Sequence, residues 1–555
     1  MRDNARQIYR IVEATFPISS SSEHPRDCSA ASSDGEELHC RWEQASRPSS
    51  VEDVSLAILS QFCKRAQQIL SSAASNYDLS YLKCGILLSA ISLSISLLVY
   101  VLNSLPRIPE TATQTTATIV LLTSLSYAFM SFASSYVEEE QHFWYWGTSI
   151  FLLYLLLRSF SHLTTTSLPS ALRQTIAPLL LLTIHRLTTR LNQTGQKHTS
   201  SPSIAGTFLP SNSPILLVLV LTTYLSLFRR VLLRCFPPSF PSALRFILST
   251  TTVLSSLAFK ISFVNADAPE FLNSLSLPPS LANLLTHAST PLMLITQART
   301  VFLALGLTYS LSLLFSPTPK GRIVPQPPKW LAHDLLTLLL VTQTRFTNIP
   351  VYLIFEMQLS LLIGLIPRLD ATSASLTGLL AGRTAFFAMG GSNAISSVDL
   401  SSAYNGVGGY NVVAVGLLTF VSNWAGAIWW VSATSILLLQ AGGREPISQQ
   451  ERVEKETKMV HEPSQGDAKS ERLAVHLNST GPRGIWTQHV TAQTLFVSAG
   501  TTGIMGACAV LRQHLFVWTV FSPKYLYAVA WGLGFHLITS LGFGSVLHWI
   551  GGGWD

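Results

Sequence analysis

The sequence predicts an all-α polytopic membrane protein with about 13 transmembrane helices. Only 12% of its 555 residues are charged, whereas soluble domains contain about 25%, and the mean hydropathy is +0.36. The apolar residues gather in runs long enough to cross a hydrocarbon core, which takes roughly 20 residues. These runs are rich in leucine and do not alternate with polar residues, so they favour helices over a β-barrel.

The predicted membrane spans follow one another from residue 84 to residue 547, and prolines interrupt the gaps between them. They cover approximately residues 84–105, 115–136, 146–163, 170–188, 213–233, 243–264, 292–316, 331–347, 349–366, 376–392, 410–438, 488–510 and 524–547. We expect no fixed-period repeat, because none is visible in these runs.

Positive charge predicts the orientation of the spans. If the odd-numbered spans run from lumen to cytosol, the short cytosolic loops hold more Lys and Arg than the opposite side, Arg230 and Arg383 among them. The glycine-rich connector 390–411 is then lumenal. We therefore interpret the net charge of +7 as a determinant of membrane topology. Because no basic face is interleaved with aromatic residues, we do not predict nucleic acid as a partner.

Composition divides the chain into four segments. Residues 1–82 are expected to be loop-like up to residue 50 and then to form an amphipathic helix. Residues 83–440 form the first part of the helix bundle, 441–487 a disordered cytosolic loop, and 488–555 the last helices. The first 82 residues hold no secretory signal. Cys28 and Cys40 either pair in an oxidising lumen or remain free thiols.

Unusual polar residues gather at the lumenal ends of the predicted spans. Glu139, Glu140 and His142 either receive a polar headgroup or form a solvated turn beside aromatic anchors. Lys260 lies near the end of an apolar span, where it needs a partner or reaches out to water, and Asp267 follows it.

Further along the chain, Glu356 lies about two turns inside an apolar run, where a carboxylate costs at least ~2.5 kcal/mol. It should face other helices, pair or be protonated. Asn393 and Asp399 belong to the glycine-rich connector, which suits a sugar or phosphate ligand or a tight re-entrant turn.

Arg512 and His514 join the last two spans in a stretch typical first of a membrane interface and only second of a ligand site. We find no hydrolase, zincin or P-loop motif. The sequence therefore predicts no catalytic residue and no metal ligand in this chain.

Several separated motifs resemble the membrane region of the GPI ethanolamine phosphate transferases. They are FVNADAPEF, GGSNAISSVDLSSAYNGVGGYN and RQHLFVWTVFSPKYLY, and SSYVEEEQHFWYW and RLNQTGQKH are similar to the branch that acts on the second mannose. The resemblance implies a multi-pass enzyme of the endoplasmic reticulum membrane. Such enzymes move ethanolamine phosphate from phosphatidylethanolamine to a mannose of the GPI precursor lipid. A small stabilising membrane subunit is an implied partner.

The resemblance also implies a lumenal catalytic domain with a threonine nucleophile and zinc. The opening RDNARQIYRIVEATFP resembles the tail of that domain, so we expect the zinc ligands on a missing domain. On this basis the chain is expected to come from an incomplete gene model rather than to be a true short product. The rival functions are a lipid transporter or scramblase that uses Glu356 and Lys260, and a non-catalytic lipid-binding subunit.

Overall fold

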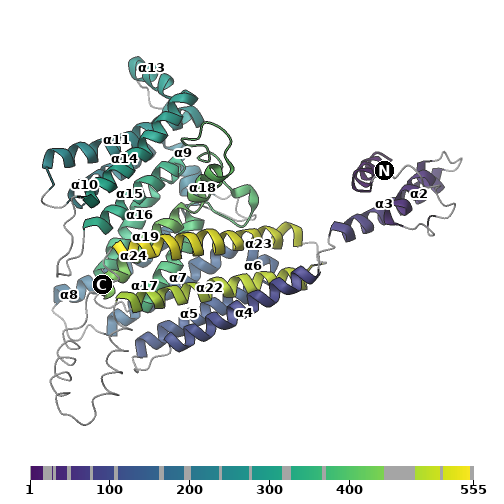
Figure 1. Cartoon of the computed structure of the whole chain (residues 1–555), viewed down its shortest axis with the longest axis horizontal. Coiled ribbons are helices and arrows are strands. Elements are labelled where there is room, and N and C mark those ends of the chain that lie inside the picture. Colours follow the sequence, from purple (N-terminus) through teal and green to yellow (C-terminus); the bar gives the residue numbers. More distant parts are fainter. Residues whose placement is uncertain are drawn as a thin grey trace, which may run out of the picture. The chain divides into compact units, whose positions relative to one another are not determined.

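The computed structural model is helical in all its regular elements within the residues it describes. These are residues 2–16, 28, 33–46, 52–74, 79–104, 111–161, 168–192, 202–234, 236, 240–273, 278–314, 327–365, 371–442, 482–512 and 517–550. The chain forms two compact units, residues 1–87 with 511–514 and residues 88–510 with 515–555. We describe each unit by itself (Figure 1).

The first unit contains α1 (Arg2–Thr15), α2 (Asp34–Ser46) and α3 (Glu52–Ala74). Its buried core is formed by Ala5, Val12, Leu38, Ala45, Leu59, Phe62, Ala66 and Ile69. The expectation that residues 1–50 are loop-like is therefore wrong for α1 and α2. In α1, Ala5, Ile8 and Val12 recur at helical spacing on one face, and this face packs into the core. The amphipathic helix predicted after residue 50 is present as α3.

Polar contacts also join the helices of the first unit. Cys28 and Cys40 form a disulfide. Glu37 of α2 accepts hydrogen bonds from Arg65 at 2.7 and 2.8 Å and from Arg41 at 2.9 Å. The bond from Arg65 holds the pKa of Glu37 below its ordinary value. These contacts supplement a small hydrophobic core, as is usual in short helical units.

The second unit is a bundle of long helices with short helical segments at their ends. The long helices are α4 (Leu79–Ser104, which begins in the first unit), α5 (Thr111–Met130), α7 (Glu140–Ser161), α8 (Leu168–Thr188), α10 (Ser213–Arg234), α11 (Ser242–Asp267), α14 (Pro291–Leu314), α15 (Pro327–Gln343), α16 (Val351–Leu365), α17 (Ala371–Ala388), α18 (Val412–Asn423), α19 (Ala425–Gly442) and α22 (Pro482–Val510). A last helical stretch runs through α23 (Ser522–Val529), η8 (Ala530–Phe543) and α24 (Gly544–Ile550).

The short segments are α6 (Ser134–Glu138), η3 (Ile204–Phe208), α9 (Leu209–Ser211), α12 (Glu270–Asn273), α13 (Pro279–Ala288), η4 (Phe346–Asn348), η6 (Ile395–Ser397) and η7 (Val517–Phe521).

Each predicted span coincides with a helix or with a pair or series of helices. Among the described residues, seven helices are long and apolar enough to cross a membrane, or up to eight if a bent pair counts as one span. That pair is α18 and α19, which meet at 72°. The span predicted over 410–438 therefore coincides with this bent pair. Helix α18 ends at Asn423. The side-chain amide of Asn423 forms two hydrogen bonds with the backbone of Asp399.

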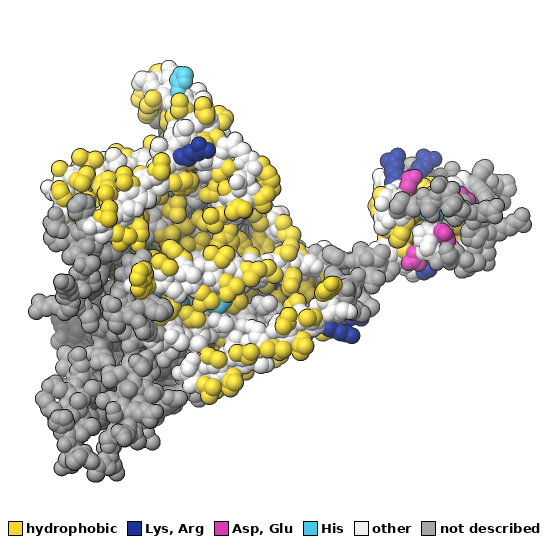
Figure 2. All heavy atoms as spheres, viewed as in Figure 1, with side chains coloured by type: hydrophobic (Ala, Val, Ile, Leu, Met, Phe, Trp, Pro, Cys, Tyr) yellow, Lys and Arg dark blue, Asp and Glu magenta, His cyan; other side chains and the backbone are white. Residues whose placement is uncertain are grey.

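Helix α17 lies at the centre of the bundle, with every residue from Thr372 to Ala388 buried. It packs against α19, α7 and α22. Glycines permit close approach of backbones here, since a Cβ at Gly426 would lie 2.9 Å from the carbonyl oxygen of Ala385. On the outside, hydrophobic side chains cover much of the visible face of the helices (Figure 2), as expected of a surface that meets lipid.

Candidate functional site

The segment 389–411, here called the polar loop, connects α17 to α18 and carries the glycine-rich motif. Gly390 and Gly406 adopt positive φ angles of 95° and 80°, which a side chain would strain. Hydrogen bonds fasten the loop to distant helices. Arg299 of α14 donates to the Gly406 carbonyl at 2.8 Å, and Asn405 donates to Gln343 of α15 at 3.0 Å. The polar loop is therefore an ordered part of this end of the bundle.

Asn393 anchors the polar loop to a buried ion pair. Its amide donates to the Glu140 carboxylate at 2.6 Å and to the Val137 carbonyl at 2.9 Å. Glu140 forms a buried ion pair with Lys524, which also donates to the Tyr127 hydroxyl at 2.9 Å. Glu140 and Lys524 are 1% and 2% exposed, so this centre is closed to solvent and to a ligand of headgroup size.

Arg383 lies beside this ion pair and not in a cytosolic loop, so the sequence-based placement of Arg383 is wrong. It is 6% exposed within α17, and its guanidinium lies 3.6 Å from the centre of the Trp531 ring. The rings of Phe496 and Trp144 lie 5.0 and 5.4 Å away. Aromatic faces attract a desolvated cation, which explains how an arginine is accommodated inside an apolar helix.

Asp399 organises the open end of the polar loop. It accepts a hydrogen bond from Arg345 at 2.7 Å and one from the Ser401 backbone at 3.0 Å. Burial raises the pKa of Asp399, but the bonds from Arg345 and Ser401 outweigh this, and the pKa lies below its ordinary value. Asp399 is therefore charged at neutral pH.

A cavity of about 270 Å³, here called the Lys260 pocket, opens beside Asp399. Its charged lining consists of two cations, Lys260 and Arg345, and two carboxylates, Asp267 and Asp399. Phe263, Phe271 and Phe346 supply apolar walls. Lys260 is 1% exposed and donates to the Thr342 carbonyl at 3.4 Å. The pocket thus offers both charge signs within one small volume.

Side-chain amides continue the polar network on the other flank of the loop. Asn192, which follows α8, donates to Asn348 at 3.1 Å and to the Ala388 carbonyl at 2.6 Å. Asn348 in turn donates to the Met389 carbonyl at 2.8 Å. The ends of α8 and α17 and the turn before α16 are thereby held together.

Glu356 belongs to a different group, here called the Glu356 cluster, with Arg230, His333 and Asp334. Glu356 forms an ion pair with Arg230, and Arg230 lies 3.3 Å from Asp334. His333 lies 3.5 Å from Glu356. The carboxylate therefore pairs, one of the outcomes expected for it. Arg230 lies within α10 rather than in a loop, so its predicted placement is wrong.

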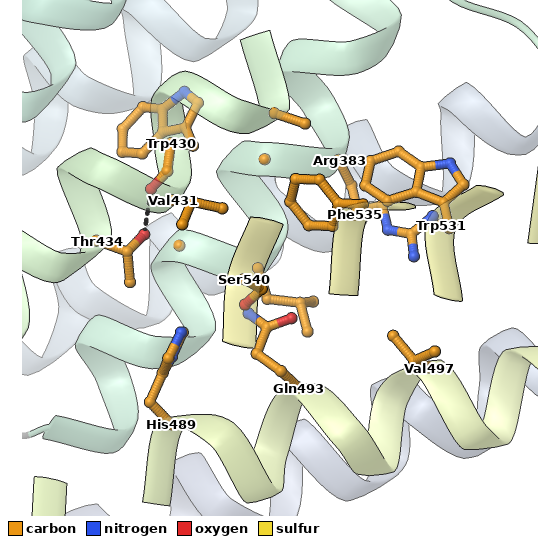
Figure 3. Close-up of a pocket in the computed structure, with 14 residues that line it drawn as sticks. Arg383, Trp430, Val431, Thr434, His489, Gln493, Val497, Trp531, Phe535 and Ser540 are labelled. Atoms are coloured by element: carbon orange, nitrogen blue, oxygen red, sulfur yellow. Dashed lines mark hydrogen bonds between the residues drawn. The ribbon is translucent and has the colours of Figure 1, made fainter. Parts of the chain in front are cut away.

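A second internal cavity, drawn in Figure 3, lies among α17, α19, α22 and η8. Its volume is about 20 Å³, which is room for about one water molecule. In Figure 3 the side chains of His489 and Gln493 rise from α22 towards it, and Arg383 lies against Trp531. His489 shares a hydrogen bond of 2.8 Å with Ser375. This cavity is too small for a lipid headgroup.

Glu139, His142 and Arg512 are not among the residues that line the Lys260 pocket. Glu139 is paired with His142 at 3.4 Å and accepts a bond from Gln141 at 2.8 Å. Arg512 lies in the turn after α22, and His514 lies outside the described residues. The structure brings three of the sequence candidates, Lys260, Asp267 and Asp399, together in one pocket. Arg345 and Lys524 were not among the candidates predicted from the sequence, although Lys524 lies within the motif RQHLFVWTVFSPKYLY.

No group of three or more His, Cys, Asp or Glu side chains suited to a metal ion occurs in the part of the chain that the structure describes. The donor sets that zinc takes in proteins, three or four nitrogen, sulfur or carboxylate ligands, are therefore not met by these residues. The zinc that the family resemblance implies does not fit them, and we assign it no role there.

Comparison with known proteins connects this geometry to a family. Residues 74–553 match the family model described as the GPI ethanolamine phosphate transferase membrane region. GPI ethanolamine phosphate transferase 2 of Aspergillus oryzae is 33% identical over 97% of the chain and 55% of its own length. The enzymes of the same name from Aspergillus fumigatus and Saccharomyces cerevisiae are 32% and 29% identical, over 88% and 84% of the chain and 48% and 50% of their own lengths.

No solved structure matches the chain. The chain spans about half the length of the curated relatives it matches. The family model nevertheless covers the whole helix bundle, including the polar loop, the Lys260 pocket and the buried Glu140–Lys524 pair. The chain therefore belongs to the GPI ethanolamine phosphate transferase 2 family and comprises the membrane region of that family.

Proposed function

We propose that this chain is the membrane module of an enzyme of the endoplasmic reticulum that adds ethanolamine phosphate from phosphatidylethanolamine to a mannose of the GPI precursor. On family resemblance the acceptor is the second mannose. The observation that carries the proposal is the Lys260 pocket, in which Lys260 and Arg345 lie with Asp267 and Asp399.

The charges of the pocket suit a zwitterionic headgroup. Arginine binds phosphate oxygens through paired N–H donors, and lysine adds a point charge. The carboxylates of Asp267 and Asp399 are acceptors for the ethanolamine ammonium group. Because Asp399 is anchored to Arg345 and to the end of α18, its carboxylate is held in place before a ligand arrives.

Positioning is the contribution that such a module makes to transfer. Two lipids that diffuse in a membrane react faster when their headgroups are held together, because translational and rotational entropy is lost in advance. The polar loop forms a common wall for this purpose. Glu140 and Asn393 fix the loop from behind, while Lys260, Asp267 and Asp399 contact the headgroup. For Glu139, His142, Glu356, Arg512 and His514 a substrate role stays a prediction.

The proposal includes a layout of 13 spans with the polar loop on the lumenal side. The disulfide between Cys28 and Cys40 supports a lumenal N-terminal unit, because disulfides persist in oxidising compartments. Glycosylation sites created by substitution, without added residues, in the polar loop and in the 441–487 connector test the layout. Modification of the first site alone is expected, and modification of both would contradict the layout.

The functional test places Asp267→Asn and Asp399→Asn at the chromosomal locus, so that the intact gene product carries each change. Both are expected to cause GPI precursors without ethanolamine phosphate on the second mannose to accumulate, at normal protein level. Glu270→Gln is the matched control, because Glu270 is exposed three residues from Asp267 and does not line the pocket. Normal transfer in both pocket variants would refute the proposal.

The rival functions predict other results. A scramblase would move labelled lipid between the leaflets of liposomes that contain the purified chain. A non-catalytic subunit would co-purify with a transferase and show no transfer defect in the pocket variants. In the Glu356 cluster, which a transporter would use, both carboxylates contact Arg230. The Lys260 pocket instead surrounds a cavity with both charge signs, so the pocket supports the transferase module best.

A further inference from the structure

A groove of about 730 Å³ lies on the outside of the bundle between α8, α10 and α16. This outer groove is separate from the Lys260 pocket and shares no lining residue with it. Its apolar lining is Leu180, Ile184, Leu233, Leu353, Met357 and Leu361. Several of these side chains are open to the outside, with Leu233 at 65% and Met357 at 54% exposure.

The helices that form the outer groove indicate that lipid surrounds it. Two of its walls, α10 and α16, belong to the candidate membrane spans Ser213–Leu233 and Phe346–Leu365. Exposed leucine and methionine side chains at this level meet hydrocarbon rather than water. The volume lies in the range of about 300–1,000 Å³ that is typical of ligand sites. An acyl chain is the simplest occupant of such a surface.

The charged residues that line the outer groove indicate the charge of its occupant. Arg230 and Glu356 both line the groove and form an ion pair with each other, and Arg230 also lies 3.3 Å from Asp334. Arg229 also lines it and is exposed, and among the described residues no carboxylate forms an ion pair with it. A guanidinium at the edge of an apolar groove favours an anionic partner.

The position of Arg229 matches the depth of a lipid phosphate. It lies five residues before the end of α10 at Arg234, which is about 7 Å along a helix axis. It is therefore close to the end of the candidate span, where phospholipid phosphates meet the hydrocarbon core. Ser226 and Ser360 add small hydroxyl groups to the lining, which leave room beside the larger side chains.

We infer that the outer groove binds one glycerophospholipid, with its phosphodiester against Arg229 and an acyl chain along the apolar lining. This site lies beyond the function proposed for the Lys260 pocket. A bound lipid in this place fills the space between α8, α10 and α16 and covers the Glu356 cluster from the membrane side.

The test uses the purified full chain in nanodiscs and two photo-crosslinking probes with the same acyl diazirine. One probe is phosphatidylethanolamine and the other is diacylglycerol, which lacks the phosphate. Mass spectrometry of the labelled peptides is expected to show the phospholipid probe on the groove segments of α10 and α16. Loss of a charge-assisted hydrogen bond in Arg229→Gln should lower that labelling by at least about tenfold.

A second variant tests the apolar part independently. Ser360→Trp fills the groove at an exposed position and leaves Arg229 in place, and it should lower the labelling similarly. Arg190→Gln, a change of another exposed helix-end arginine outside the groove, should leave it unchanged. Labelling at the wild-type level in Arg229→Gln or in Ser360→Trp would overturn the inference. Diacylglycerol labelling as strong as that of the phospholipid probe would also overturn it, and so would a co-purified polypeptide crosslinked in the groove instead of lipid.

Discussion

The polar loop is held by two ion pairs that differ in their surroundings. The Glu140–Lys524 pair is closed, with side-chain exposures of 1% and 2%. The Arg345–Asp399 pair is open, with exposures of 60% and 17%, and it lines a cavity. Asp399 of the open pair belongs to the loop itself, whereas the closed pair holds the loop through the Asn393 amide. The difference suggests a division of tasks, because only the open pair can exchange its partner for a ligand.

Solvation explains why the two pairs should respond differently to substitution. Removing one member of a buried pair leaves a charge without its counter-charge in a medium of low dielectric, which costs about 3–5 kcal/mol. An exposed pair gains only about 0–1 kcal/mol, since water screens it and the side chains lose entropy on pairing. The closed pair should therefore determine folding, and the open pair should determine binding.

The largest effect is expected for Lys524→Met, which leaves Glu140 buried without its cation. The purified protein should lose about 3–5 kcal/mol of stability in detergent, measured by thermal unfolding. The double variant Lys524→Met with Glu140→Gln should recover part of this loss, because neither member of the pair is then left charged without the other. A double variant as unstable as the sum of the single changes would show that the pair is not coupled.

A smaller loss is expected for Asn393→Ala, which removes the donor to Glu140 and to the Val137 carbonyl. The Val137 carbonyl then loses this donor, while Glu140 keeps Lys524 and Trp144, so the loss should be about 1–3 kcal/mol in total. Asn212→Ala provides the control, since Asn212 makes only a local bond to Phe208. If the two variants unfold at the same temperature, Asn393 does not anchor the loop.

Arg345→Gln should change stability by no more than about 1 kcal/mol, because the side chain is 60% exposed. It should nevertheless weaken binding of phosphatidylethanolamine to the Lys260 pocket by about tenfold or more, through the loss of a charge-assisted bond to phosphate. Native mass spectrometry of the chain with titrated lipid measures this. If Arg345→Gln binds phosphatidylethanolamine as tightly as the wild-type chain does, Arg345 does not bind the headgroup.

The smallest effect concerns pH. The pKa of Asp399 is lowered in the folded chain, so its pairing contributes stability above the ordinary aspartate pKa of about 3.9. That contribution is lost only as pH falls through the lower folded value. Headgroup binding should therefore persist from pH 7 to about pH 5, and Asp399→Asn should abolish any loss below that range. A midpoint near pH 6 in lipid titrations would point to another group.

Long apolar runs were readable from the sequence because their length alone requires a membrane. The bend at the end of α18 could not be predicted from the sequence, because the apolar run continues through Trp424. The bend coincides with hydrogen bonds between Asn423 and the backbone of Asp399, which is distant in the sequence. The Ser-rich composition of residues 1–50 concealed α1, although its apolar face has the spacing of a helix.

The residues of the candidate site could be predicted only in part, because their partners lie far away in the sequence. Glu138, Glu139 and Glu140 are adjacent acids, and nothing local tells which one turns inward. Lys524, the partner of Glu140, lies 384 residues away. Glu356 could be expected to pair because burial penalises a lone carboxylate. The identity of its partner, Arg230, depends on how α10 and α16 lie relative to each other, and a single sequence does not contain that information.

The fastening of the polar loop bears on protein engineering. Extended non-helical connectors are normally the favoured places for epitope tags and fluorescent insertions. This connector is pinned by Asn393, Asp399, Asn405 and the Gly406 carbonyl, so extra residues would displace several anchors at once. A tag would be better tolerated in α13, a short helix without a single buried residue.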